Sequence, residues 1–243
     1  MNRGHPSSIG TLINSQFAYW RQQREAAGPL KGLIARRERE PFITISREYG
    51  CGGYYIAGTI ATLLNTDYRA LPEWVAYDRK VLDTVMEDMG LSSQLVETLT
   101  TSARKQMTNL FQTTFSKFPP QVAVYRKLAE TVRTLALHGH VVIVGRAGRA
   151  ITRGMENGFH ARIIAPLEWR VERMAGLCKI TKKDAERMIL EKSRRREDFL
   201  KTFVRFDSAD PHNYHLTIDE SEFSPEDVAR LIVEGMRLRG LLK

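Results

Sequence analysis

The chain has little cysteine and no long apolar run. Its 243 residues include only two cysteines, Cys51 and Cys178, which lie far apart in unlike contexts. A disulfide framework or a zinc–cysteine site is therefore not expected, and two free thiols fit a reducing compartment, which we expect to be the cytoplasm. No apolar run approaches the roughly 18 residues that span a membrane, and residues 1–20 lack the apolar segment of a secretory signal. The six histidines show no ligand spacing, so we expect no metal site built by the protein alone.

Positive charge is in excess. Lysine and arginine number 37 against 28 acidic residues, a formal net charge of +9. The excess is either a solvated basic surface or a sign of an anionic partner: a nucleotide, a nucleic acid or an acidic lipid. Arg146 directly follows Gly145 and Arg47 lies three residues before Gly50, and single arginines close to glycine turns suit small phosphates. Aromatic residues do not alternate with the basic runs, which argues against a stacking platform for nucleic acid.

Apolar patterning predicts alternating strands and helices after an N-terminal extension, residues 1–40, that carries an amphipathic helix at 11–26 and a basic stretch at 36–39. Strands are predicted at 42–46, 74–78, 140–145, 161–166 and 214–219. Helices are predicted at 54–64, 125–136 and 166–178. Two more are predicted to begin after the capping residues Thr181 and Ser224, the second running to about 238, and residues 79–118 are predicted to be mostly helical. This alternation predicts a three-layer α/β fold with a mainly parallel sheet, in which ligands bind at the carboxyl ends of the strands.

The first of these strand ends carries a glycine-rich loop, "SREYGCGG". Gly50, Gly52 and Gly53 permit close backbone approach, and their N–H groups, with the helix that follows, can surround a phosphate. The loop departs from the pattern G-x-x-x-x-G-K-[ST], because Arg47 replaces the first glycine, Gly53 the lysine and Tyr54 the hydroxyl residue. A tight strand-to-helix turn without a ligand is the alternative interpretation.

Three further strand ends or helices carry polar candidates. Asp78 and Arg79 follow the second strand, either at the rim of a site or as a helix cap followed by a surface arginine. Arg146 follows an apolar strand and Gly145, where a guanidinium can bind a phosphate through two hydrogen bonds. The run at 194–196 is "RRR"; successive helical residues point about 100° apart, so only one or two of these arginines can face a ligand.

Several stretches, in this order, resemble the cytidylate kinase-like proteins, a branch of the P-loop nucleoside monophosphate kinases: "ITISREYGCGG", "AYDRK", "LHGHVVIVGRAG", "APLEWRVERM", "RRRED" and "DPHNYHLTID". The resemblance covers about 42–238. It implies a P-loop NTPase-like domain over 41–243, with a five-stranded parallel sheet, a helical NMP-binding insert at 79–120 and a lid at 179–212. The implied reaction moves the γ-phosphoryl group of ATP to CMP or dCMP with Mg²⁺.

The resemblance also implies roles for individual residues. The phosphate loop would be Gly50, Cys51, Gly52 and Gly53. Arg146 would lie near the acceptor phosphate, Arg195 and Arg196 in the lid near the transferring phosphoryl group, and Arg170 and Arg173 on the helix before the lid. Cytidylate kinases keep the loop lysine, a following hydroxyl and an aspartate where this chain has Ala147.

Three functions stay open. The first is an active kinase in which Arg47, or Arg195 and Arg196 on a closing lid, supplies the charge of the missing lysine. The second is a nucleotide-binding pseudokinase. The third is a protein that binds nucleic acid or a membrane surface through its basic N-terminal stretch. The N-terminal extension is also a candidate contact for a homo-oligomer.

Overall fold

A five-stranded parallel sheet forms the centre of the molecule. The computed structural model describes residues 9–27, 40–87 and 122–242. The strands are β1 (Phe42–Arg47), β2 (Val75–Tyr77), β3 (Val141–Val144), β4 (Gly158–Ile164) and β5 (Leu216–Asp219). Their order is β2-β3-β1-β4-β5, and every neighbouring pair is parallel. The α/β class and the parallel sheet expected from the sequence are therefore confirmed.

The two central strands read as continuous apolar runs because both of their faces are covered. All of β3 is buried, as are the first four residues of β1. Ile45 of β1 pairs with Val144 of β3 on one side and Ala161 of β4 on the other. This register brings the carboxyl ends of β1 and β3 to one edge of the sheet, where the predicted site residues follow.

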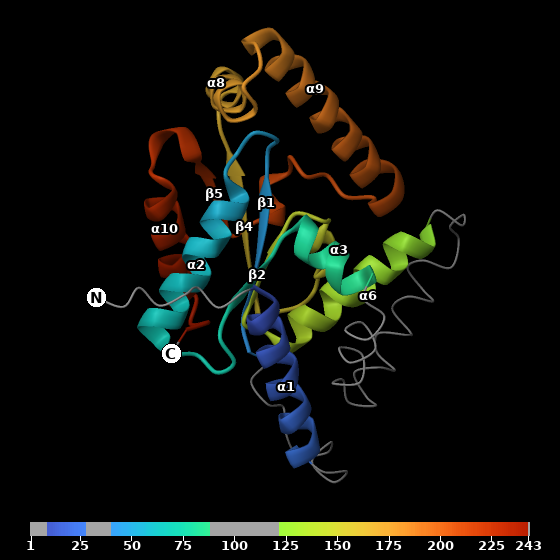
Figure 1. Cartoon of the computed structure of the whole chain (residues 1–243), viewed down its shortest axis with the longest axis vertical. Helices are drawn as coiled ribbons and strands as arrows, with labels where there is room; N and C mark the ends of the chain where they lie inside the picture. Colours follow the sequence, from blue (N-terminus) through green and yellow to red (C-terminus); the bar gives the residue numbers. More distant parts are fainter. Residues whose placement is uncertain (1–8, 28–39, 88–121, 243) are drawn as a thin grey trace.

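Helices cover both faces of the sheet (Figure 1). On one face, α2 (Gly53–Tyr68) and α10 (Pro225–Leu238) share an apolar cluster with Ile43 and Val142. On the other face, α1 (Ile9–Ala27), α3 (Arg79–Glu87) and α6 (Val122–His138) share a second cluster with Phe42 and Val141. Successive residues of one strand thus serve opposite layers, as the period of a strand requires.

The helix predicted at 11–26 is present as α1, and it packs into the body of the protein. Trp20 is buried, and its ring stacks on His138 with centroids 4.4 Å apart. The buried Gln16 accepts a hydrogen bond from the Tyr77 hydroxyl (2.8 Å) and donates one to the carbonyl of His140 (3.0 Å). Residues 9–27 therefore share the core of the sheet domain, and the basic stretch at 36–39 lies outside the described residues.

Two helices rise beyond the carboxyl edge of the sheet, α8 (Leu167–Cys178) and α9 (Lys182–Phe199) (Figure 1). Thr181 caps α9 as predicted, accepting a hydrogen bond from the Asp184 N–H at 3.1 Å. The remaining short elements are α7 (Gly148–Ile151), η2 (Leu200–Val204), η3 (Pro211–Asn213) and η4 (Glu220–Glu222). Most of the predicted NMP-binding insert, residues 88–120, lies outside the described residues. No helix in the described ranges is long and apolar enough to cross a membrane.

Candidate functional site

The glycine loop (residues 47–53) joins β1 to α2 at the carboxyl edge of the sheet. Gly50 has φ of +103°, and a Cβ there would lie 2.9 Å from the Cβ of Arg170, so this position requires glycine. Gly52 is the N-cap of α2 and provides no side-chain cap. The first N–H groups of an α-helix have no intrahelical acceptor. In α2 these groups and the positive end of the helix dipole lie at the end of the glycine loop. The backbone is therefore suited to an anion.

The Arg47 side chain fills the space between two glycines. A Cβ on Gly53 would lie 3.3 Å from Cγ and Cδ of Arg47, and a Cβ on Gly145 would lie 2.1 Å from its Nη1. The aliphatic part of Arg47 therefore passes beside Gly53, the position of the usual loop lysine, and its guanidinium ends against Gly145 at the tip of β3. Burial, and then the charges of Arg196 and Arg146, lower the pKa of Arg47 to about 10. No described carboxylate forms an ion pair with it.

Of the two predicted lid arginines, one faces the loop. Arg196 donates a hydrogen bond to the Arg47 carbonyl, and its guanidinium lies 5.9 Å from the centre of the Tyr49 ring. Burial lowers its pKa. Arg195 instead lies exposed on α9 and forms an ion pair with Glu191 one turn earlier, at 2.5 Å. Of these two lid arginines, Arg196 is therefore the one that adds charge at the glycine loop.

Arg146 leaves β3 toward α3, where a carboxylate already holds it. Its Nη2 contacts both carboxylate oxygens of Asp83, while its buried Nε has no hydrogen-bond partner among the described residues. Asp78 accepts a hydrogen bond from the Val81 N–H at 2.9 Å and so caps α3. The side chain of Arg79 is 80 % exposed and lies 3.5 Å from Asp83. Asp78 thus caps α3, and its charge also lies close enough to Arg47 and Arg146 to act on their pKa values in the raising direction.

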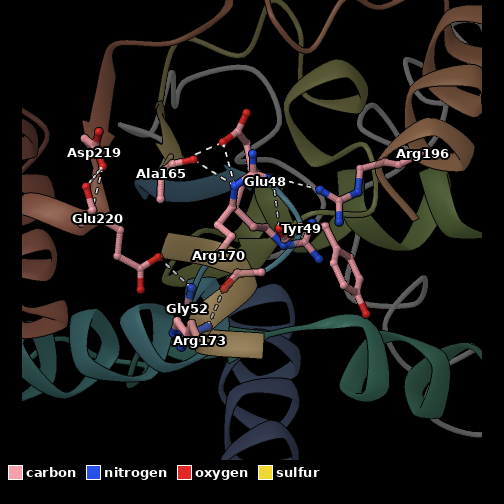
Figure 2. Close-up of polar contacts among 12 residues, drawn as sticks. Glu48, Tyr49, Gly52, Ala165, Arg170, Arg173, Arg196, Asp219 and Glu220 are labelled. Atoms are coloured by element: carbon pink, nitrogen blue, oxygen red, sulfur yellow. Dashed lines mark hydrogen bonds and ion pairs between the residues drawn. The ribbon is translucent and has the colours of Figure 1, made fainter. Parts of the chain in front are cut away.

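Two arginines of α8 hold the glycine loop by its carbonyl groups (Figure 2). Arg170 donates to the carbonyl of Tyr49 at 3.2 Å and to that of Ala165 at 2.9 Å. Arg173 donates to the carbonyl of Gly50 at 2.6 Å. Both residues therefore hold the backbone of the loop in place, and they connect the loop to α8, the helix that precedes the predicted lid.

A carboxylate that the sequence patterns did not single out also reaches the loop. The buried side chain of Glu220, which follows β5, accepts a hydrogen bond from the Gly52 N–H at 2.7 Å (Figure 2). Burial and the nearby Glu220 carboxylate raise the pKa of the Cys51 thiol to about 12, so Cys51 is a neutral thiol in the loop. The position of Glu220 directly after the last predicted strand was the available signal, because all carboxyl strand ends meet at this edge.

The structure thus combines a five-stranded parallel sheet, a glycine loop after β1 and arginines at neighbouring strand ends. The sequence model of the cytidylate kinase-like family matches residues 42–222. The chain therefore belongs to the cytidylate kinase-like family.

Two known proteins are similar to the chain. A cytidylate kinase from Aeropyrum pernix is 29 % identical over 157 residues, which cover 64 % of this chain and 90 % of that protein. The crystal structure of an uncharacterized protein from Eubacterium ventriosum superposes with a TM-score of 0.60 at 19 % identity, covering 80 % of this chain and 97 % of the other. The second similarity supports the fold.

Proposed function

We propose that the protein transfers the γ-phosphoryl group of ATP to a nucleoside monophosphate, CMP or dCMP. The observation that carries the proposal is the course of Arg47, whose side chain passes beside Gly53, where the usual lysine is missing, and ends with its positive charge at Gly145 on the same edge of the sheet. Because phosphoryl transfer is catalysed mainly by positioning and by fixed positive charge, an arginine at this place can supply what the lysine usually supplies.

The proposed reaction assigns one task to each group. An oxygen of the acceptor phosphate bonds to the γ-phosphorus of ATP while the bond from that phosphorus to the β,γ-bridging oxygen breaks, and ADP leaves with the electron pair. Arg47 and the first N–H groups of α2 would bind the donor phosphates. Arg146, held in place by Asp83, would bind the acceptor phosphate. Arg196 would add charge from α9, and we assign that task to Arg196 and not to the outward-facing Arg195.

Magnesium, which the family implies, fits the protein side of this site poorly. The two residues that follow Gly53 are Tyr54 and Tyr55, whose side chains are 55 % and 57 % exposed, and the Tyr55 hydroxyl donates to Glu226 at 2.7 Å. Within the described ranges, no group of three or more acidic, histidine or cysteine residues could hold a metal ion. The roles above are therefore assigned to the chain's own residues.

A coupled assay of ADP release over a panel of nucleoside monophosphates tests the proposal. We expect turnover with CMP or dCMP, and a loss of turnover of roughly 100-fold or more in Arg47→Ala, comparable to the loss of a catalytic arginine. Arg194→Ala is the matched control, because Arg194 is an exposed neighbour on α9. Turnover that survives in Arg47→Ala would show that the charge comes from another residue.

A second candidate function is a nucleotide-binding pseudokinase, and two contacts favour it. Glu220 accepts the Gly52 N–H that a phosphate would use, and Asp83 neutralises Arg146. The same assay separates the two candidates: nucleotide binding without ADP release for any monophosphate would establish the pseudokinase. Binding of random oligonucleotides that weakens steeply with salt would instead favour the nucleic-acid alternative.

A further inference from the structure

Four arginines lie close together at the carboxyl edge of the sheet, and few carboxylates form ion pairs with them. Arg47 lies against Gly145 at the tip of β3, and Arg196 donates to the carbonyl of Arg47. Arg162 of β4 donates to the carbonyl of Ser208, with its guanidinium 5.6 Å from the centre of the Tyr214 ring. These three and Arg146 form what we call the arginine cluster. Within the described ranges, only Arg146 of the four is in an ion pair.

The arginine cluster is unfavourable in the protein by itself. Burial and the neighbouring charges of Arg196 and Arg146 lower the pKa of Arg47 to about 10, and burial and the charge of Arg162 contribute to the lowered pKa of Arg196. Like charges removed from water destabilise the folded state unless a counter-charge joins them. A ligand with several negative charges would supply that counter-charge, and it would do so between the glycine loop and the lid.

The carboxylates that contact the glycine loop are already engaged. Glu48 accepts a hydrogen bond from the Ala165 N–H at 3.2 Å and lies 3.5 Å from Arg170. Glu220 accepts the Gly52 N–H. Because tyrosines follow Gly53, this loop offers a divalent cation neither the usual hydroxyl nor an uncommitted carboxylate. An anion at the same place would instead meet Arg47, Arg162 and Arg196, three guanidinium groups without a paired carboxylate among the described residues.

We propose that Arg47, Arg162 and Arg196, the members of the arginine cluster without a paired carboxylate in the described part of the chain, neutralise the phosphates of a nucleoside triphosphate directly, so that the site binds the metal-free nucleotide at least as tightly as its magnesium complex. This inference rests on the proposed nucleotide-binding function and specifies the form of the donor. In a loop that shares the ligand with a metal ion through its own hydroxyl, removal of magnesium would weaken binding. Here the metal-free form carries more negative charge toward the same arginines.

Isothermal titration calorimetry of the full chain with ATP tests the inference, once in excess EDTA and once in excess magnesium chloride. We expect an equal or lower Kd in EDTA. Inorganic triphosphate, titrated in parallel, shows whether the phosphate chain alone is recognised or the nucleoside is required. A Kd that is lower with magnesium than in EDTA, by more than the error of the titration, would overturn the inference and leave the proposed function intact. An absence of ATP binding in both buffers would overturn both.

Arg47→Met provides a second test that separates a ligand site from a structural residue. We expect it to weaken ATP binding in EDTA by roughly 10- to 100-fold, the loss typical of a charge-assisted hydrogen bond. We also expect the Tm of the ligand-free protein to stay the same or rise, because the substitution removes a buried like charge. Arg194→Met should change neither quantity. A lower Tm with unchanged ATP affinity would show that Arg47 is structural and would overturn the inference. If the Met variant does not fold, Arg47→Lys provides the test instead: it keeps one positive charge and should retain most of the ATP binding.

Discussion

The hydrogen bond between Glu220 and the glycine loop predicts how substitution of Glu220 changes the affinity for ATP. Its carboxylate accepts the Gly52 N–H at 2.7 Å, and its side chain is buried, with only 3 % of the residue exposed. Under the proposed function a donor phosphate needs the same N–H group. Glu220→Gln keeps the size of the side chain and an oxygen that can accept this hydrogen bond, but it removes the negative charge. We therefore expect this variant to bind ATP more tightly than the parent protein.

The size of the effect follows from electrostatics. Two anions that compete for one N–H group lie about 5 Å apart, and their repulsion at an effective dielectric constant near 20 is about 3 kcal/mol. Rotation of the Glu220 side chain away from the ligand relieves part of this repulsion. If about half remains, the substitution contributes roughly 1.5 kcal/mol to binding, which is about a tenfold lower Kd.

Calorimetric titration of the parent, of Glu220→Gln and of Glu222→Gln measures this effect. Glu222 is an exposed residue of the same short turn, η4, and its substitution should leave the affinity unchanged. An unchanged Kd in Glu220→Gln would mean that the Gly52 N–H is not part of the phosphate site. A higher Kd would mean that the charge of Glu220 stabilises the binding conformation of the loop, and it would refute the competition described above.

Three further predictions concern acid stability and the room around Arg47. Burial holds the pKa of His160 at about 2, so only the unfolded chain, with a histidine pKa near 6.5, takes up this proton. Stability should therefore be lost as the pH falls below about 6.5, by up to roughly 1.4 kcal/mol per pH unit, as urea midpoints at successive pH values would show; a His160→Gln variant with an equally steep loss would contradict this. Gly145→Ala should displace the Arg47 guanidinium and lower both Tm and ATP affinity, whereas Gly154→Ala, at a similar φ of +80° but in open space, should lower Tm alone. Gly53→Lys would bring its Cβ 3.3 Å from Cγ and Cδ of Arg47, so it should lower Tm by more in the parent protein than in an Arg47→Gly background; an equal loss in both backgrounds would contradict the shared space.

Local patterns located the five strands and the main helices, but not the strand order or the first three residues of β4. The all-apolar run of β3 predicted a strand covered on both faces, and the Thr181–Asp184 cap predicted the start of α9. Both signals lie within a few neighbouring residues, where hydrophobic period and capping chemistry act directly. The helix at 11–26 was predicted from the same kind of pattern, but its place against β2 and α6 was not, because its apolar face could have packed on any surface.

The contacts that shape the site join residues far apart in the chain, and patterns could not predict them. The Glu220–Gly52 hydrogen bond spans 168 positions, and the Arg146–Asp83 pair spans 63. The sequence placed Arg146 at the correct edge of the sheet but could not show that α3 brings a carboxylate to it. Helical geometry limited the run at 194–196 to one or two inward residues, and the choice of Arg196 depends on how α9 lies over the loop.

The unusual residues of the glycine loop depend on one another. The course of Arg47 requires a glycine at position 145, where a Cβ would lie 2.1 Å from its Nη1, and it fits closely beside Gly53, where a Cβ would lie 3.3 Å from its Cγ and Cδ. A lysine at position 53 would start in close contact with the aliphatic part of Arg47, so the arginine and the absent lysine are linked. Independent loss of function at each position would not require such a fit. The fit favours a loop that obtains its positive charge from β1 instead of α2, and hence the kinase over the pseudokinase.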